Sequence, residues 1–587
     1  MKKRSIISLL SLALVLPAVT ACGINFGSTQ SESPSAKSTS DNNYTVESDA
    51  YVSTTESTAD TWYEEPMAAT AGSANYAATK SDAAEYCCET EACDTMCYPV
   101  YDPYVQGETY DVLDESGLRD VKLSPLSTFA ADVDTASYSN MRRFVNMGYG
   151  LYDFSDVAIR AEEMINYFKY DYSAPKDGQR FGVDSTISDC PWNKDHKLMI
   201  LGVSTKTLNE NKKPDSNIVF LIDVSGSMDS QNKLPLLKES MKMMVENLTA
   251  NDRVSIVTYA NGTNVVLDGV RGNRTDEINR AFESLTAGGG TNGEGGIELA
   301  YKIAQENFIK NGNNRVILAT DGDFNIGKCS GSELEDLISE KKETGVFLSV
   351  LGFGMGNYND VTAETLADSG NGNYSYIDSL AEAKKVLVDE FNSTLYTVAK
   401  DTKFQVEFNP AMVSKYRLIG YENRALAAED FKDDTKDGGE VGAGHQVTVV
   451  YELELADEDS DSGLRYQDNS LSARGRAKDE WCTLSIAYKD PDKNESDYLE
   501  FPIDANDYTT RPSDSFILAT SAAEYAMALN DSEYLVDMSR EEALEQAIKN
   551  VKKIDSNDEI VQEFLGLMEA VSGNYSYYYD DNSYWYE

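Results

Sequence analysis

Three loops near the middle of this 587-residue chain contain oxygen-bearing side chains at spacings that suit a bound ion. The first loop begins at Asp223, and in a near-extended backbone Asp223, Ser225 and Ser227 point to the same side. The second loop places Thr291 after three glycines, which let backbone approach closely, and the third loop contains Asp321. Carboxylate and hydroxyl oxygens suit a hard cation, Mg²⁺ above all. The pattern therefore predicts a metal site if the three loops meet.

The elements around these loops must bring them together. The first loop follows Asn217–Ile222, a continuous apolar run typical of a buried parallel strand, and the third follows a similar run at Val316–Ala319. Strand and helix patterns alternate from residue 217 to about 395, which predicts a doubly wound, mostly parallel α/β sheet. In such a sheet the carboxyl ends of different strands meet at one crevice. Strands are expected near 217–223, 252–259, 263–268, 314–320, 346–352 and 374–377, and helices near 233–248, 275–285, 293–308, 332–343, 360–368 and 381–395.

Strand patterns on both sides of this region predict a second, flanking architecture. Antiparallel strands are expected after residue 400, and two earlier ones at 181–188 and 197–205 are expected to pair with them, so that the α/β domain is inserted in a β-sandwich-like domain. Helices are expected at 137–147 and 157–168, the second capped by Asp156, and again between 514 and 571. The later strands are expected near 404–408, 416–421, 446–455, 481–488 and 498–503. The chain is therefore divided into a signal segment at 1–21, an acidic spacer at 22–118, an N-terminal flanking region at 119–212, the α/β domain at 213–398, a β-rich flanking domain at 399–512, C-terminal helices at 513–573 and a Tyr-rich acidic tail at 574–587.

The three loops resemble the von Willebrand factor type A domain and its metal-ion-dependent adhesion site. The resemblance implies that the Asp-x-Ser-x-Ser loop, Thr291 and Asp321 share one divalent cation, Mg²⁺ or else Ca²⁺ or Mn²⁺. The flanking stretches Phe129–Tyr138, Ile159–Phe168 and Gly439–His445 look like parts of a bacterial lipoprotein family with a central domain of this type. Members of that family often carry a calcium-activated-chloride-channel-like label.

The start of the chain has the features of an export signal. Lys2, Lys3 and Arg4 precede a short apolar stretch, and small residues then lead to Cys22. This arrangement resembles the lipobox of bacterial lipoproteins, which implies cleavage before Cys22, acylation of that residue and a lipid anchor on the extracytoplasmic face of the cell membrane. The alternative is an ordinary secretory signal with an incidental cysteine. No later stretch approaches 18 uninterrupted apolar residues, so we expect no transmembrane pore from this chain alone.

Charge and cysteine content limit the partners. The chain has 51 basic and 99 acidic residues, a net charge of −48, which argues against nucleic acid as a partner. Residues 22–118 are acidic and rich in Ser and Thr, and are predicted to be a disordered spacer. Within the spacer, Cys87, Cys88, Cys93 and Cys97 lack the spaced pairs of a metal knuckle, so local disulfides or dispensable thiols are the preferred interpretation. The Tyr-rich acidic tail, 574–587, is predicted to be disordered.

A few further residues invite a functional interpretation but are better explained structurally. Asp132 and Asp134 could suggest a second cation, although a turn at a helix entry explains them better. Asp323 is interpreted as a solvated loop acid, not a metal ligand. His196 and His445 have no clustered partners and are predicted to be structural or on the surface.

The predicted function is that of a surface-anchored lipoprotein that binds a protein partner through the divalent ion. An Asp or Glu of the partner would complete the coordination sphere. A second possibility is an accessory or regulatory subunit of a membrane transporter or channel complex. A metal-dependent hydrolase is a third, but the sequence has no nucleophile elbow, no P-loop and no convincing Cys–His pair, so no enzymatic activity is predicted.

Overall fold

The computed structural model describes residues 108–573, except for 109, 111–112, 155–156, 158, 209–212, 323–330, 357, 457–479, 492 and 494. Internal contacts divide the chain into the units Met1–Met96 and Cys97–Glu587, and every described residue belongs to the second unit. The signal segment, Cys22, the cysteines at 87–97, Asp156, Asp323 and the tail at 574–587 therefore lie outside the described residues.

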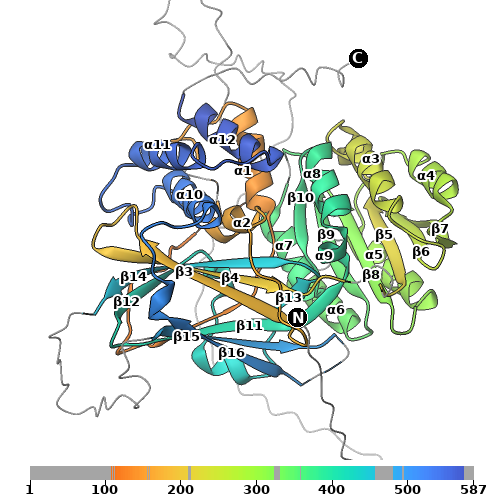
Figure 1. Cartoon of the computed structure of the whole chain (residues 1–587). Helices are drawn as coiled ribbons and strands as arrows, with labels where there is room; N and C mark the ends of the chain where they lie inside the picture. Colours follow the sequence, from red (N-terminus) through yellow and green to blue (C-terminus); the bar gives the residue numbers. More distant parts are fainter. Residues whose placement is uncertain are drawn as a thin grey trace, which may run out of the picture. The chain divides into compact units, whose positions relative to one another are not determined.

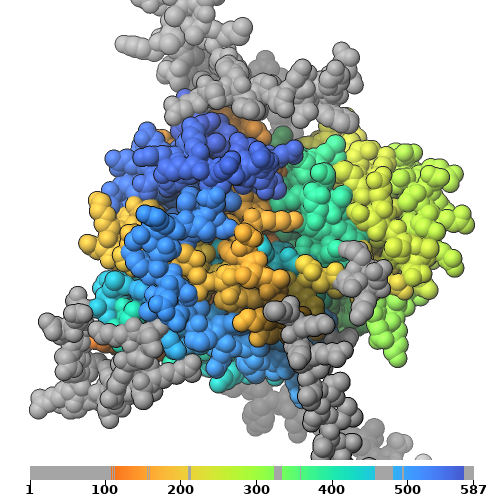
Figure 2. All heavy atoms as spheres, viewed as in Figure 1, coloured from red at the N-terminus to blue at the C-terminus, as the bar shows by residue number. Residues whose placement is uncertain are grey.

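One domain of this unit, on the right in Figure 1 and Figure 2, is built on a six-stranded sheet in the order β10-β9-β8-β5-β6-β7. All neighbouring strands are parallel except β6 and β7, which form an antiparallel edge. The strands are β5 (Ser216–Asp223), β6 (Arg253–Tyr259), β7 (Thr263–Arg271), β8 (Asn313–Thr320), β9 (Phe347–Phe353) and β10 (Tyr374–Ile377). The helices between and after them are α3 (Leu234–Val245), α4 (Thr275–Glu283), α5 (Gly293–Glu306), α6 (Gly331–Lys342), α7 (Asp360–Ser369), α8 (Leu380–Lys384) and α9 (Phe391–Leu395), with a π-helical turn, η3 (Lys385–Asp389), between the last two.

The side-chain pattern of β5 explains why helices cover both faces of this sheet. All eight of its residues are buried, and alternate residues point to opposite faces. Ile218, Phe220 and Ile222 pack in a core with α3 and α4, whereas Val219 and Leu221 pack in a second core with α5, α6 and α7. A strand buried on both faces needs a continuous apolar run, which is what the sequence has there. The predicted doubly wound fold is confirmed.

The flanking β-rich region forms two packed sheets, built from strands on both sides of the central domain. One sheet has the order β1-β12-β14-β4-β3 and the other β13-β11-β15-β16, with β2 paired to β11. The expected pairing across the inserted domain is confirmed, because β4 lies antiparallel to β14. The strands are β1 (Arg119–Asp120), β2 (Leu126–Ala130), β3 (Phe181–Asp189), β4 (His196–Thr205), β11 (Thr397–Phe408), β12 (Val413–Ile419), β13 (Gly439–Gly442), β14 (Gln446–Leu455), β15 (Glu480–Lys489) and β16 (Asp497–Asp504).

Five further helices cover the outer face of the sheet that contains β4. Leu198 and Ile200 of β4 pack in the helical core, while Leu201 and Val203 pack between the two sheets. The helices are α1 (Ala136–Asn146), α2 (Ala161–Asn166), α10 (Asp514–Leu529), α11 (Arg540–Val551) and α12 (Glu559–Val571), and Figure 1 shows the last three, in blue, next to α1 and α2.

The helix expected at 157–168 is shorter than predicted and begins at Ala161. Arg160 has an extended backbone, with φ −70° and ψ 120°. The cause is tertiary: Asn530 accepts a hydrogen bond from the Ile159 N–H at 3.3 Å and donates one to the Ile159 carbonyl at 2.6 Å. These bonds hold the segment before α2 in a non-helical conformation that local periodicity could not reveal.

Candidate metal-binding site

The first predicted loop leaves the carboxyl end of β5 as a compact turn. Asp223 is the last residue of the strand and is completely buried. Its Oδ1 accepts a hydrogen bond from the Ser225 N–H at 2.8 Å, and the Ser225 and Ser227 hydroxyl oxygens lie 2.9 Å apart. The structure therefore brings the three side chains of this loop together, as their spacing predicted.

The second loop is joined to the first by backbone hydrogen bonds. The Gly226 N–H donates to the Gly289 carbonyl at 3.0 Å, and the Gly288 N–H donates to the Val224 carbonyl at 2.8 Å. Gly289 has φ +93°, a left-handed conformation that favours glycine. Thr291, which is half-buried, follows two residues later at the start of α5. These backbone bonds hold the second loop against the first at Gly288 and Gly289, two residues before Thr291.

The third loop leaves β8, the strand next to β5. Because Ile222 is in register with Ala319, Asp223 and Thr320 lie at the same level of the sheet. The Thr320 hydroxyl lies 3.5 Å from Asp223 Oδ2, at the limit of a hydrogen bond. Asp321, the next residue, is completely buried. Two acidic side chains therefore meet at one edge of the sheet.

The electrostatics of this edge favour a cation. Burial raises the pKa of Asp223 to about 6, although hydrogen bonds from Ser225 oppose the shift. The nearby Asp321 raises the pKa of Asp223 further. A cation bound between the two carboxylates would favour their ionised forms.

Lys233 is a residue of this site that the sequence analysis missed. Its ammonium group lies 2.9 Å from Asp321 Oδ2, and its side chain is only 6% exposed. Its stem crosses Gly354, where an added Cβ would come within 2.3 Å of the lysine carbons. Only the absence of a Cβ at residue 354 leaves room for this path. A lysine just before an amphipathic helix normally lies in solvent, so the sequence carried no signal of this contact.

The donor set suits a hard divalent ion better than zinc. It comprises two carboxylates and three hydroxyls, with neither a thiolate nor an imidazole. Within the described ranges, no cluster of three or more His, Cys, Asp and Glu side chains could hold a metal ion. The candidate site has only two such residues, and its remaining oxygens come from Ser225, Ser227 and Thr291.

The other residues singled out in the sequence have structural partners. The His196 ring lies 2.6 Å from Glu452. His445 is half-buried, and the desolvation of its ring lowers its pKa to about 4, which keeps the ring neutral at pH 7. Asp132 accepts a hydrogen bond from the Asp134 N–H at 3.0 Å in the turn before α1, and both carboxylates pair with Arg424. The cation that Asp132 and Asp134 face is thus a guanidinium group.

Family models match most of the described chain. The von Willebrand factor type A domain model matches residues 217–390, and a model described as von Willebrand factor matches residues 104–200. The central domain is therefore a von Willebrand factor type A domain, a class that points to adhesion or another protein interaction. A third model, described as "Uncharacterized protein YfbK, C-terminal", matches residues 393–573.

The chain belongs to the YfbK family, because it is 42% identical over 474 residues to the Escherichia coli protein described as "Uncharacterized protein YfbK". That match covers 79% of this chain and 81% of the relative. A protein of Synechocystis, sll0103, is 28% identical over 31% of this chain and 42% of its own length. The human inter-alpha-trypsin inhibitor heavy chain H2 is 28% identical over 24% of this chain and 15% of its own length.

Solved structures give only a distant likeness. A von Willebrand factor type A protein from Catenulispora acidiphila is 16% identical and covers 66% of this chain and 89% of its own, with a TM-score of 0.38. At that score the likeness carries no argument about function. Separately, none of the helices among the described residues is both long and apolar enough to cross a membrane.

Proposed function

We propose that this protein binds a protein partner through a divalent cation held by Asp223, Ser225, Ser227, Thr291 and Asp321. The observation that supports the proposal most is the meeting of the β5 and β8 loops, where two completely buried carboxylates lie beside paired serine hydroxyls. Buried carboxylates are expensive unless a positive charge compensates them. The ammonium group of Lys233 supplies one such positive charge, 2.9 Å from Asp321, and a divalent ion would supply the charge that two carboxylates require.

The chain's own residues would prepare the site for an external acid. Hydroxyl ligands add no negative charge, so Ser225 and Ser227 would leave the ion's charge less neutralised than a cage of carboxylates would. Mg²⁺, when bound, would supply an open coordination position that an Asp or Glu oxygen of the partner can fill. Ser227 and Thr291 are half-buried, whereas Asp223 is completely buried, so these two hydroxyl residues are partly accessible to a partner.

We further propose that the chain is anchored at the extracytoplasmic face of the cell membrane through acylated Cys22. The positive residues, the short apolar stretch and the small residues before Cys22 support this. Residues 22–118 would then separate the anchor from the folded unit. Metabolic labelling with a fatty acid, compared between wild type and Cys22→Ser, tests the anchor directly.

The test of function is affinity capture from native cells with full-length wild type, Asp223→Ala and Asp229→Ala, each with Mg²⁺ or with EDTA. Asp229 is an exposed acid at the end of the same turn, so its variant is a matched control for charge. We expect a partner that wild type and Asp229→Ala retain in Mg²⁺, and that both EDTA and Asp223→Ala release. Equal capture by wild type and Asp223→Ala would refute the proposal. A partner that is a polytopic membrane protein would favour the accessory-subunit role over adhesion.

A further inference from the structure

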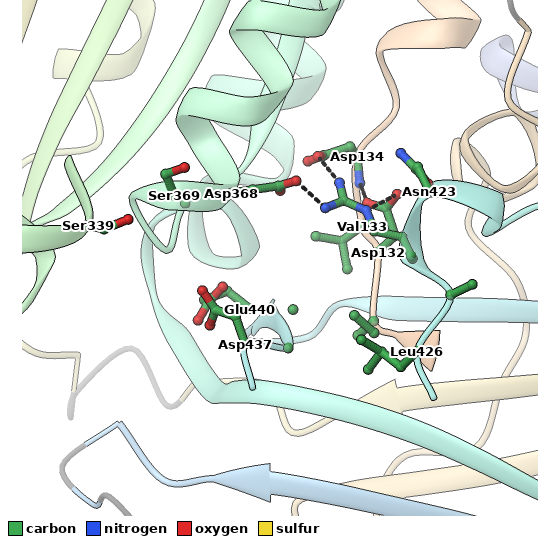
Figure 3. Close-up of a pocket in the computed structure, with 17 residues that line it drawn as sticks. Asp132, Val133, Asp134, Ser339, Asp368, Ser369, Asn423, Leu426, Asp437 and Glu440 are labelled. Carbon is green, nitrogen blue, oxygen red and sulfur yellow. Dashed lines mark hydrogen bonds and ion pairs between the residues drawn. The ribbon is translucent and has the colours of Figure 1, made fainter. Parts of the chain in front are cut away.

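A cavity of about 300 Å³ lies away from the candidate metal site, between the sandwich and the central domain (Figure 3). Its walls come from the segment before α1, the end of α7, the 423–426 turn and the 437–440 segment that leads into β13. This volume is at the small end of the range for small-molecule sites.

The walls of this cavity carry far more negative than positive charge. Five carboxylates and one guanidinium line it. The guanidinium, that of Arg424, is already shared: it donates to Asp132 at 3.1 Å and Asp134 at 3.4 Å, and it also pairs with Asp368. The single positive charge of Arg424 is therefore shared among several acids on its own side of the cavity.

The opposite wall contains Glu440 and Asp437. Figure 3 shows their carboxylates together, on the other side of the cavity from Asp132 and Asp134. Glu440 is only 8% exposed, and its Oε1 has no hydrogen-bond partner within the described part of the chain. Asp437 is more exposed and pairs with Lys342 at 2.7 Å. Glu440 is thus a buried carboxylate without an ion pair of its own, in the wall of a cavity.

A buried carboxylate in this position is costly to ionise. Burial raises the pKa of Glu440 well above its ordinary value, and Asp437 and Asp401 raise it further, against the smaller opposing effects of Lys342 and of a hydrogen bond from the Asp401 backbone. Such a group gains free energy from any cation that can enter and donate hydrogen bonds to it. Packing alone does not require a charged side chain at either Glu440 or Asp437.

We propose that this cavity binds a small organic cation, whose ammonium or guanidinium group donates hydrogen bonds to Glu440 and Asp437. A metal ion fits less well, because the described residues contain no group of three or more metal-ligating side chains of the His, Cys, Asp and Glu type. The cavity is also much larger than one coordinated ion requires. An organic cation fills the volume and needs only two carboxylates with suitable hydrogen-bond geometry.

Titration calorimetry with putrescine and agmatine on the purified full-length chain in EDTA tests the proposal. We expect one of the two amines to bind, with Glu440→Gln weakening its affinity by about tenfold or more, as expected for loss of a buried charge-assisted hydrogen bond. Glu500→Gln is the matched control, because Glu500 is an exposed acid on β16, outside the cavity. Asp223→Ala should bind the amine as wild type does, which separates this site from the metal site.

Binding of neither amine would overturn the proposal, and so would equal affinities in wild type and Glu440→Gln. A separate calcium titration without EDTA, showing binding that Glu440→Gln abolishes, would overturn it too, because the cavity would then be a metal site. Should Glu440→Gln fail to give the same melting transition as Glu500→Gln, Asp437→Asn takes its place. That variant alters the more exposed acid of the same wall and should also weaken amine binding.

Discussion

At the scale of single residues, Lys233 is the group that most directly opposes metal binding at the candidate site. Its ammonium contacts Asp321 within a buried pair, so a divalent ion and Lys233 compete for the same carboxylate. This competition would lower the affinity of the site for Mg²⁺. In the absence of the ion, the ammonium group of Lys233 would neutralise the negative charge of Asp321.

We expect Lys233→Met to bind Mg²⁺ roughly tenfold more tightly than wild type, because the repulsion between the ammonium and the ion is removed. Titration calorimetry measures the change. Lys238→Met, which alters a lysine that donates to the Leu285 carbonyl and not to the site, should leave the affinity unchanged. Weaker binding by Lys233→Met would show that Lys233 supports the site instead of competing with the ion.

The residue types that form the candidate site could be found from the sequence, whereas their neighbours could not. Asp223, Ser225 and Ser227 alternate within one short stretch of the chain, directly after a buried strand that ends at Asp223. Lys233 and Gly354 meet only through the fold, since 121 positions separate them and neither position has a local pattern. Whether Thr291 and Asp321 bind the ion stays a prediction.

At the scale of elements, α10 contains a buried acid whose protonation should affect stability. Glu524 is completely buried and accepts a hydrogen bond from Gln546 of α11 at 3.0 Å. Burial raises the pKa of Glu524 to about 8, although that hydrogen bond opposes the shift. The folded state therefore binds this proton more tightly than the unfolded state. The contribution of Glu524 is most favourable below its unfolded pKa and is lost as the pH rises toward 8.

We expect Glu524→Gln to be more stable than wild type at pH 8.5, by roughly 2–5 kcal/mol, because the amide never ionises. The difference should shrink as the pH falls to 5. Urea unfolding across this pH range measures it, with Glu545→Gln on the exposed face of α11 as the control. Parallel pH curves for wild type and Glu524→Gln would contradict the assignment.

Helices and strands could be predicted where the local sequence pattern determines them. The predictions failed where contacts with residues far away in the sequence determine them. The β5 and β14 strands lie where their apolar runs placed them. The short strands β2 and β13 were not predicted, because each is defined mainly by its pairing with β11, far away in sequence. The start of α2 was predicted too early for the same reason. Asn530, at the end of α10, forms hydrogen bonds with Ile159 and holds the segment before α2 in a non-helical conformation.

At the scale of the whole folded unit, arginines connect the flanking regions to the central domain. Arg142 of α1 pairs with Asp378 after β10, with Glu382 of α8 at 2.7 Å and with Glu563 of α12 at 3.1 Å. Arg160 similarly pairs with Asp360 at 3.1 Å, at the start of α7. These buried pairs make the inserted domain and its flanks interdependent.

We expect Arg142→Met to lower the free energy of unfolding by roughly 3–5 kcal/mol, because it leaves buried acids without their partner. Urea denaturation measures the loss. Arg280→Met, at an exposed position of α4, should change stability by less than about 1 kcal/mol. A loss no larger for Arg142→Met than for Arg280→Met would contradict a linking role for Arg142.

The proposed function depends on one divalent ion bound by residues of the loops after β5 and β8 and before α5. Equilibrium dialysis of the purified full-length chain against Mg²⁺, with wild type, Asp223→Ala and Asp229→Ala side by side, measures that binding. We expect one bound Mg²⁺ per chain for wild type and Asp229→Ala, and none for Asp223→Ala at the same free concentration. The proposal fails if wild type binds no ion or if Asp223→Ala still binds one.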